Sequence, residues 1–214
     1  MSLVTIRAEV DAACHDAGRR PDDVALLAVT KNRAVADIQP LLDAGHRIFG
    51  ENRIQEAAKK WPNLREQYSD IALHFIGHLQ TNKVKEAVAL FDMIETVDST
   101  RLATALAQEM KKQGRMVPCL LQVNTGEEPQ KGGVAPKDIP ALYAHCAKEG
   151  LEIKGLMCIP PEDDVPDFHF ALLHKLAGQL DVPVLSMGMS GDFPRAIRYG
   201  ATHIRIGTAL FSVT

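Results

Sequence analysis

The sequence has 214 residues, of which 46% are hydrophobic and 24% are charged, a balance typical of a globular protein. Its net charge of −3 argues against a nucleic-acid-binding protein, because such proteins depend on clustered positive charge. The first residues lack the long apolar core of a signal peptide, and no apolar run is long enough to span a bilayer. The four cysteines are scattered without a CxxC pair, so we expect reduced thiols and a cytoplasmic protein.

The chain opens with a predicted amphipathic helix. Its apolar residues recur at spacings of three and four, and Ser2 before them is of a type that favours the N-cap. These apolar residues are Leu3, Ile6, Val10 and Cys14.

Eight runs of β-type apolar residues follow along the chain. Most are apolar on both faces, which indicates strands that are covered on both sides. The predicted strands span residues 24–31, 47–51, 72–77, 93–98, 118–125, 152–159, 184–188 and 203–211.

Helical spacing marks several of the intervening segments. The marked segments lie near residues 38–42, 102–110, 139–146, 168–176 and 193–197. Most of them end at a glycine, which accepts a positive φ without strain and is therefore a common helix stop. In the segment 168–176, the stripe formed by Phe168, Leu172 and Leu176 is predicted to be core.

Alternation of strands and helices predicts an α/β fold with a parallel sheet. Eight is the number of strands that closes a (β/α)8 TIM-type barrel, and an open doubly wound sheet is the alternative. No linker or change of composition divides the chain, so we expect one domain over residues 1–214. The sequence ends three residues after the last predicted strand, so we expect no helix there, and the extra N-terminal helix could cover that part of the barrel.

Two cationic residues stand out where chemistry is expected, at the carboxyl ends of the strands. Lys31 ends the first predicted strand, and Arg205 lies inside the last one, which barrel closure places beside the first. A lysine in a partly dry pocket near an arginine has its neutral amine favoured, and a neutral amine condenses with an aldehyde. The structural alternatives are that Lys31 pairs with Glu51 or Glu95 and that Arg205 pairs with an acid from another strand.

An anion site is predicted after strands seven and eight, where this fold usually binds phosphate. In GMSGD, Ser190 and Gly191 fall where the next helix is expected to begin, so unpaired amides would face the anion. Gly207 and Thr208 at the end of strand eight would add an amide and a hydroxyl. The alternative is that Ser190 is only an N-cap. The two sites together suit an aldehyde that carries a phosphate.

Seven segments spread over the whole chain resemble the pyridoxal phosphate homeostasis protein family. They are LLAVTK, FGENRIQEA, LHFIGHLQTNK, QVNTGEEPQKGG, GLMCIPP, LSMGMSGDF and RIGTALF. The resemblance implies a barrel of pyridoxal-phosphate fold type III, like the N-terminal domain of alanine racemase. It also implies that pyridoxal 5′-phosphate (PLP) is the cofactor.

The resemblance further implies a role for each matching residue. Lys31 of AVTK would hold the cofactor as a Schiff base, and Arg205 of RIG would face the pyridine nitrogen. Ser190, Gly207 and Thr208 would cradle the phosphate. Asn52 of GEN is expected beside the cofactor ring.

The implied function is cofactor supply and the balance of amino and keto acids, without an established catalytic activity. A guanidinium opposite the ring nitrogen makes the ring a weak electron sink. Racemisation in the related barrel enzymes also uses a tyrosine from an additional domain, and none of the three tyrosines here falls at a predicted strand's carboxyl end. A PLP-dependent enzyme with weak or unknown activity, such as amino-acid racemisation, stays as the alternative.

Expectations about partners follow from the same resemblance. Apo forms of PLP-dependent enzymes are possible recipients of the cofactor. We expect a monomer, because the racemase's dimer-building second domain is missing, and neither nucleic acid, membrane nor metal as a partner.

Overall fold

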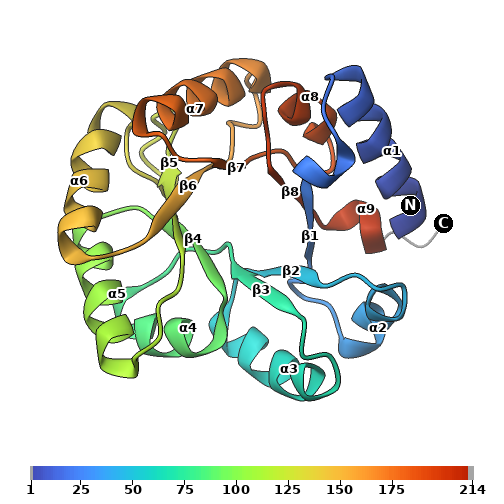
Figure 1. The fold of residues 1–214 in the computed structure, drawn as a ribbon, viewed down its shortest axis with the longest axis horizontal. Helices are drawn as coiled ribbons and strands as arrows, with labels where there is room; N and C mark the ends of the chain where they lie inside the picture. Colours follow the sequence, from blue (N-terminus) through green and yellow to red (C-terminus); the bar gives the residue numbers. More distant parts are fainter. Residues whose placement is uncertain (1, 212–214) are drawn as a thin grey trace.

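Eight parallel strands, paired in the order β1 to β8, close into a barrel in which β8 lies beside β1 (Figure 1). This computed structural model describes residues 2–211 of the chain. The strands are β1 (Ala25–Val29), β2 (Ile48–Glu51), β3 (Ala72–Phe75), β4 (Met93–Val97), β5 (Cys119–Val123), β6 (Ile153–Cys158), β7 (Val184–Ser186) and β8 (His203–Ile206). The predicted TIM-type barrel is confirmed, and the open doubly wound sheet is wrong.

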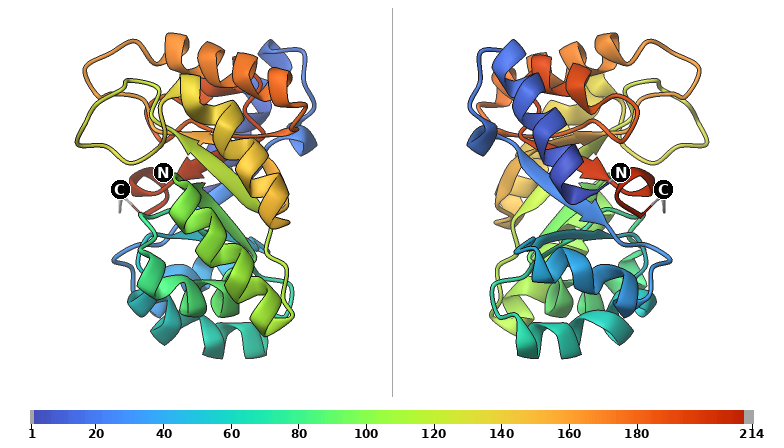
Figure 2. Two further views of the ribbon diagram at one scale, coloured as in Figure 1. Left: turned by 90° about the vertical axis from the view of Figure 1, so that its left-hand side faces the viewer. Right: turned by 90° about the vertical axis from the view of Figure 1, so that its right-hand side faces the viewer.

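Helices surround the barrel and cover the outer face of its strands (Figures 1 and 2). They are α1 (Leu3–Asp16), α2 (Val35–Asp43), α3 (Ile54–Gln67), α4 (Val84–Leu90), α5 (Thr100–Gln113), α6 (Ile139–Glu149), α7 (Pro166–Leu180), α8 (Phe193–Arg198) and α9 (Thr208–Phe211), with short 3₁₀ turns at Pro21–Asp23, Thr81–Lys83 and Pro136–Asp138. No helix in the described part of the chain is both long and apolar enough to cross a membrane.

The barrel interior carries polar as well as apolar side chains. Leu27 is in register with Arg205, and Met157 is in register with Ser186, so each pair points to the same side of the sheet. Arg205 and Ser186 are hydrogen-bonded to each other inside the barrel. The opposite side of the strands packs against the helices and forms the main hydrophobic core.

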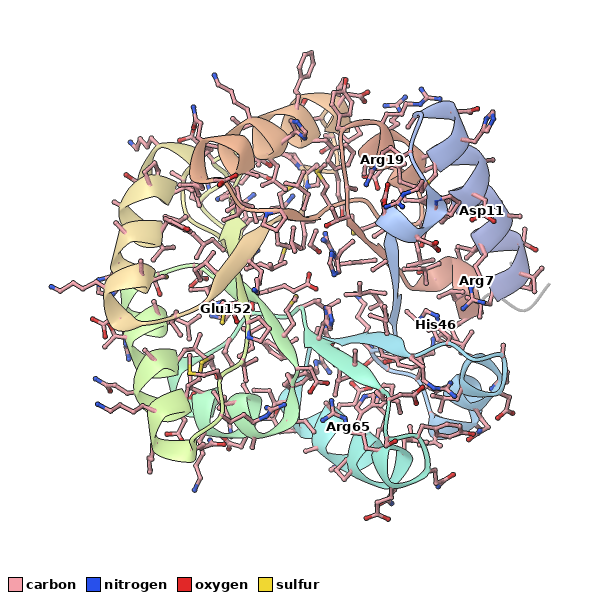
Figure 3. The ribbon with its side chains drawn as sticks, in the orientation of Figure 1. Arg7, Asp11, Arg19, His46, Arg65 and Glu152 are labelled. Atoms are coloured by element: carbon pink, nitrogen blue, oxygen red, sulfur yellow. The ribbon has the colours of Figure 1, made fainter. Side chains whose placement is uncertain are left out.

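The extra N-terminal helix packs against α8, close to where β8 meets β1 (Figure 1). Ser2 caps it, because its side chain accepts a hydrogen bond from the amide of Thr5. Just after α1, Arg19 reaches α8 and donates to the carbonyl oxygens of Ile197 and Ala201, at 2.9 and 2.7 Å (Figure 3). These bonds pin the N-terminal segment to the last part of the barrel.

The C-terminal part of the barrel differs from the expectation. Strand β8 ends at Ile206 instead of continuing to residue 211, and α9 follows it, so the prediction that no helix follows the last strand is wrong. Gly207 separates the two elements. The apolar residues that read as one long strand therefore belong partly to a short helix.

Two further expectations are corrected on the same side of the molecule. Helix α8 begins at Phe193 with Asp192 as its N-cap residue, so Ser190 and Gly191 lie in the preceding turn and not at the helix start. In α7, Phe168 is 72% exposed, whereas Phe170 and Leu173 are buried. Of the predicted stripe, Leu176 is buried in the core and Leu172 packs against it, so only Phe168 is misplaced.

Loops at the carboxyl ends of the strands project beyond the barrel. The segments 124–138 and 159–165 extend on the same side, as the yellow-green and orange loops of Figure 2. They rise over the end of the barrel where chemistry is expected.

Candidate functional site

A cavity of about 420 Å³ opens at the carboxyl ends of the strands. It is lined by Val29, Lys31, Asn52, Ile76, Gly77, Ile159, Met189, Ser190, Gly191, Arg205, Gly207 and Thr208. All six residues singled out from the sequence, namely Lys31, Asn52, Ser190, Arg205, Gly207 and Thr208, are in this set. The fold therefore brings together residues that are up to 177 positions apart, from Lys31 to Thr208.

Lys31 reaches the cavity from a loop and not from a strand. Strand β1 ends at Val29, and Lys31 is exposed, so the expectation of a lysine in a partly dry pocket is wrong. The two proposed structural partners of Lys31 are engaged elsewhere. Glu51 pairs with Lys60 and Glu95 with His74, each at 2.7 Å, and no ion pair within residues 2–211 involves Lys31.

Arg205 forms the floor of the cavity and is 4% exposed. Its Nη1 donates to Ser186 Oγ at 2.8 Å, and its Nη2 donates to the carbonyl oxygen of Cys158 at 2.8 Å. These partners belong to β7 and β6, so neighbouring strands fix the direction of the guanidinium. A buried arginine cannot shed its proton, so its charge requires compensation.

Compensation comes from Glu95, an acid in the middle of β4 with no exposed surface. Its Oε2 accepts from Ser186 Oγ at 2.5 Å, and its Oε1 accepts from His74 Nδ1 at 2.7 Å. Burial opposes ionisation of this carboxyl, but the hydrogen bond and charge of His74, together with the charge of Arg205, lower its pKa to about 2. Glu95 is thus a fixed anion joined to Arg205 through one hydroxyl.

The sequence offered a signal for Glu95 but not for its partners. An acid inside an apolar strand needs a partner for its charge, as a buried arginine does. That partner is His74 on the neighbouring strand β3, and it is joined by Ser186 of β7, which the closed barrel brings opposite β4.

The turn before α8 and the start of α9 form the wall of the cavity where the sequence predicts an anion site, here called the anion cradle. The half-buried Ser190 and the exposed Gly191 lie beside Gly207 and Thr208 in the cavity wall. The turn is held by Asp192, whose Oδ1 accepts from the amide of Met189 at 2.6 Å. The lining has two cations and no carboxylate, which favours an anionic ligand.

Asn52 contributes a polar atom that lacks a partner. Its Oδ1 is buried and accepts no hydrogen bond from any described residue. Gly77 lies against the backbone of Asn52, and a Cβ at that position would clash with the Asn52 carbonyl oxygen. Burying an unpaired amide oxygen is unfavourable, so this side of the cavity is suited to a ligand that donates a hydrogen bond.

Other candidates for chemistry lie outside the cavity lining. Burial raises the pKa of the Cys158 thiol to about 12, so it stays protonated at neutral pH. The three tyrosines lie in or at the ends of helices and do not line the cavity. His78 is exposed, with its Nδ1 3.6 Å from Asp98 Oδ2, in a neighbouring hollow after β3 and β4.

Comparison with known proteins gives a family match over almost the whole chain. The family model described as alanine racemase, N-terminal domain, matches residues 3–214. The chain is 37% identical to the pyridoxal phosphate homeostasis protein of Vibrio cholerae, covering 96% of this chain and 92% of that protein. It is 39% identical to the protein of the same name from Pseudomonas aeruginosa, covering 98% and 93%.

Solved structures agree with the sequence matches. PipY of Synechococcus elongatus with PLP bound has a TM-score of 0.82 and 36% identity, covering 95% of this chain and 100% of that chain. Alanine racemase of Clostridium difficile has a TM-score of 0.74 at 12% identity, covering 97% of this chain and 55% of that one. At that identity the likeness concerns the barrel alone.

Proposed function

The chain belongs to the family of pyridoxal phosphate homeostasis proteins, which share the barrel of the alanine racemase N-terminal domain, and on this basis we propose that its cavity binds pyridoxal 5′-phosphate. The observation that carries the proposal is the gathering of Lys31, Arg205 and the anion cradle in one cavity. PipY, whose solved structure has PLP bound, is 36% identical to this chain.

The residues present fit this cofactor. Its phosphate is an anion, and the lining supplies two cations and no acid. The loop amides and hydroxyls at Ser190, Gly207 and Thr208 suit phosphate oxygens. Asn52 lines the same cavity, and its buried Oδ1 has no hydrogen-bond partner among the described residues.

Lys31 is the primary amine of the cavity and, in our proposal, the attachment residue. PLP, when bound, supplies an aldehyde that condenses with such an amine. The ammonium of Lys31 must lose a proton to react, and the exposed position of this residue allows that proton to pass to water.

Arg205 is proposed to face the ring nitrogen and to hold that edge of the cofactor. Its guanidinium is fixed by Ser186 and the Cys158 carbonyl, and an arginine does not act as an acid in proteins, so it would orient the ring without protonating it. An unprotonated ring is a weak electron sink, which favours holding and supplying the cofactor over strong catalysis.

We therefore propose a cofactor carrier that acts in PLP homeostasis and delivers PLP to apo-enzymes in the cytoplasm. We propose that it works as a monomeric, single-domain protein over residues 1–214. Size-exclusion chromatography with light scattering tests the assembly, and a dimer mass would contradict it. An enzyme of weak activity, such as a racemase, is the second candidate, because the barrel is shared with alanine racemase.

Substituting Lys31→Ala tests the attachment residue. The wild-type protein with PLP should show an absorbance band distinct from the free cofactor, and borohydride should add the cofactor mass to the peptide containing Lys31. The variant should lose both signals and keep its melting temperature, because the side chain is exposed. Lys59→Ala, at an exposed lysine of α3, is the matched control and should behave as wild type. A label on another peptide would contradict the assignment.

A second measurement separates carrier from enzyme. The PLP-loaded protein is incubated with L- and D-amino acids in deuterated water, and then with an apo-enzyme whose recovered activity is followed. We expect transfer of the cofactor without rapid exchange of the α-proton. Rapid exchange with turnover would favour the enzyme.

A further inference from the structure

The loop that carries Lys31 rests on a cluster of charged side chains behind it. Lys60, from α3, places its Nζ 2.7 Å from both Glu51 Oε1 and Glu56 Oε1. The same ammonium donates to the carbonyl oxygens of Thr30 at 2.8 Å and of Arg33 at 3.3 Å. It therefore binds the backbone on both sides of Lys31.

Glu51 anchors the start of this loop from a fully buried position at the end of β2. Its Oε1 accepts from Thr30 Oγ1 at 2.6 Å and from Trp61 Nε1 at 3.1 Å. Thr30 is thus held through both its hydroxyl and its carbonyl oxygen. Neither Glu51 nor Lys60 lines the cavity, so the cluster acts on the loop from the outside of the barrel.

The residue after Lys31 adopts an unusual backbone conformation. Asn32 has a φ of 57°, in the left-handed region that asparagine adopts more readily than most residues other than glycine. Its amide donates to Glu56 Oε1 at 2.7 Å, and the amide of Arg33 donates to the Thr30 carbonyl oxygen. Burial opposes ionisation of Glu56, but the hydrogen bond and charge of Lys60 and the amide of Asn32 lower its pKa. The acceptor of the Asn32 amide is therefore charged at neutral pH.

This arrangement is an inefficient way to stabilise a fold. A buried ion pair loses hydration that its attraction barely restores, and apolar side chains of similar size are often at least as stable. The ions also fix a direction, because three of their hydrogen bonds end on the backbone of residues 30–33 and a fourth ends on the Thr30 hydroxyl.

We propose that Lys60, together with Glu51 and Glu56, is a positioning residue that sets the loop so that the amine of Lys31 meets the aldehyde of PLP. The inference rests on the proposed function. It assigns a role to Glu51 and Glu56 of the segment FGENRIQEA and to Lys60, which follows that segment. Asn52 of the same segment contributes to the cavity wall.

The test uses the double variant Lys60→Met/Glu51→Gln, which removes the ammonium without leaving a buried carboxylate unpaired. Glu56→Ala is a second variant, since this side chain is partly exposed and Lys60 keeps Glu51 as its partner. Glu66→Ala, at an exposed acid of the same helix, is the control. Each protein is compared in melting temperature, in amide hydrogen exchange of residues 30–33 without cofactor, and in the rate of attachment of PLP to Lys31.

We expect the melting temperatures to stay within a few degrees of wild type while exchange at Asn32 and Arg33 accelerates at least tenfold. The rate of attachment should fall at least tenfold, and the absorbance of the attached cofactor should change in position or in pH dependence. Wild-type rate and spectrum in a folded variant with accelerated exchange would overturn the inference, as would unchanged exchange. Failure of the wild-type protein itself to attach PLP would instead overturn the proposed function.

Discussion

The charge of Arg205 is balanced inside the barrel by Glu95, to which it is joined through the Ser186 hydroxyl. The Ser186 hydroxyl donates to Glu95 and accepts from Arg205, so one small side chain links the two charges. His74 supports Glu95 from the other side. The guanidinium that faces the proposed cofactor therefore depends on residues from three other strands.

Glu95→Gln tests this dependence. Removing one member of a buried pair costs roughly 3 kcal/mol of unfolding free energy at pH 7. The folded pKa of Glu95 is about 2 and its ordinary value is 4.5, so its contribution is complete above pH 4.5 and is lost as the pH falls towards 2. In urea unfolding, the free energy of the variant should differ from that of wild type by a large amount at pH 7 and by a smaller amount at pH 3. Glu152→Gln, at an exposed acid, is the control; an equal loss at both pH values would contradict the assignment.

At the scale of single residues, the sequence predicts the polar and glycine part of the cavity lining but not the exposure of Lys31. An apolar run that ends in lysine predicted a strand through residue 31, whereas β1 ends at Val29 and a turn carries the lysine outward. Lys60 could not be selected at all. Its role depends on how α3 packs behind β1 and β2, which the local pattern does not contain.

At the scale of elements, apolar runs located all eight strands because both faces of a barrel strand are covered. Helices were harder to predict where the pattern was interrupted. Helix α3 was not marked by apolar spacing, and it contains Pro62, a residue that usually ends helices. Helix α9 was read as strand because Thr208–Phe211 continues an apolar run past Gly207.

The contact between the ends of β2 and β3 gives a prediction at this scale. Gly77→Ala places a methyl group against the Asn52 carbonyl oxygen, so the loop after β2 must shift and Asn52 with it. We expect PLP affinity to fall at least tenfold in an absorbance titration. Gly178→Ala, in α7 with open space around it, is the matched control and should leave affinity unchanged. Wild-type affinity in the Gly77 variant would show that Asn52 does not shape the site.

At the scale of the whole molecule, the two ends of the barrel have different roles. The proposed cofactor site occupies the carboxyl end, whereas the amino end carries residues that hold the fold. Figure 3 views the amino end, where His46 lies near Arg7 below α1. His46 Nε2 donates to the Ile48 carbonyl oxygen at 2.7 Å, and its ring packs edge-on against Phe49.

This histidine should make stability depend on pH in weak acid. Burial lowers the pKa of His46 from 6.5 to about 4, so between these values the unfolded chain binds the proton more readily. Unfolding free energy should therefore decrease as the pH falls from 6.5 to 4, by on the order of 3 kcal/mol from this residue. In His46→Gln that part of the decrease should disappear, as measured by urea unfolding across the range. His15→Gln, at an exposed histidine, is the control, and an unchanged slope in the His46 variant would contradict the prediction.

The four cysteines are all buried and free of disulfides. Burial raises the pKa of the Cys119, Cys146 and Cys158 thiols, so these groups are both hidden and protonated in the native protein. An alkylating reagent can then mark only molecules whose barrel has opened. A short pulse of reagent, read by mass, would count opened molecules in a mixture and report on stability in a cell extract without an added dye or tag.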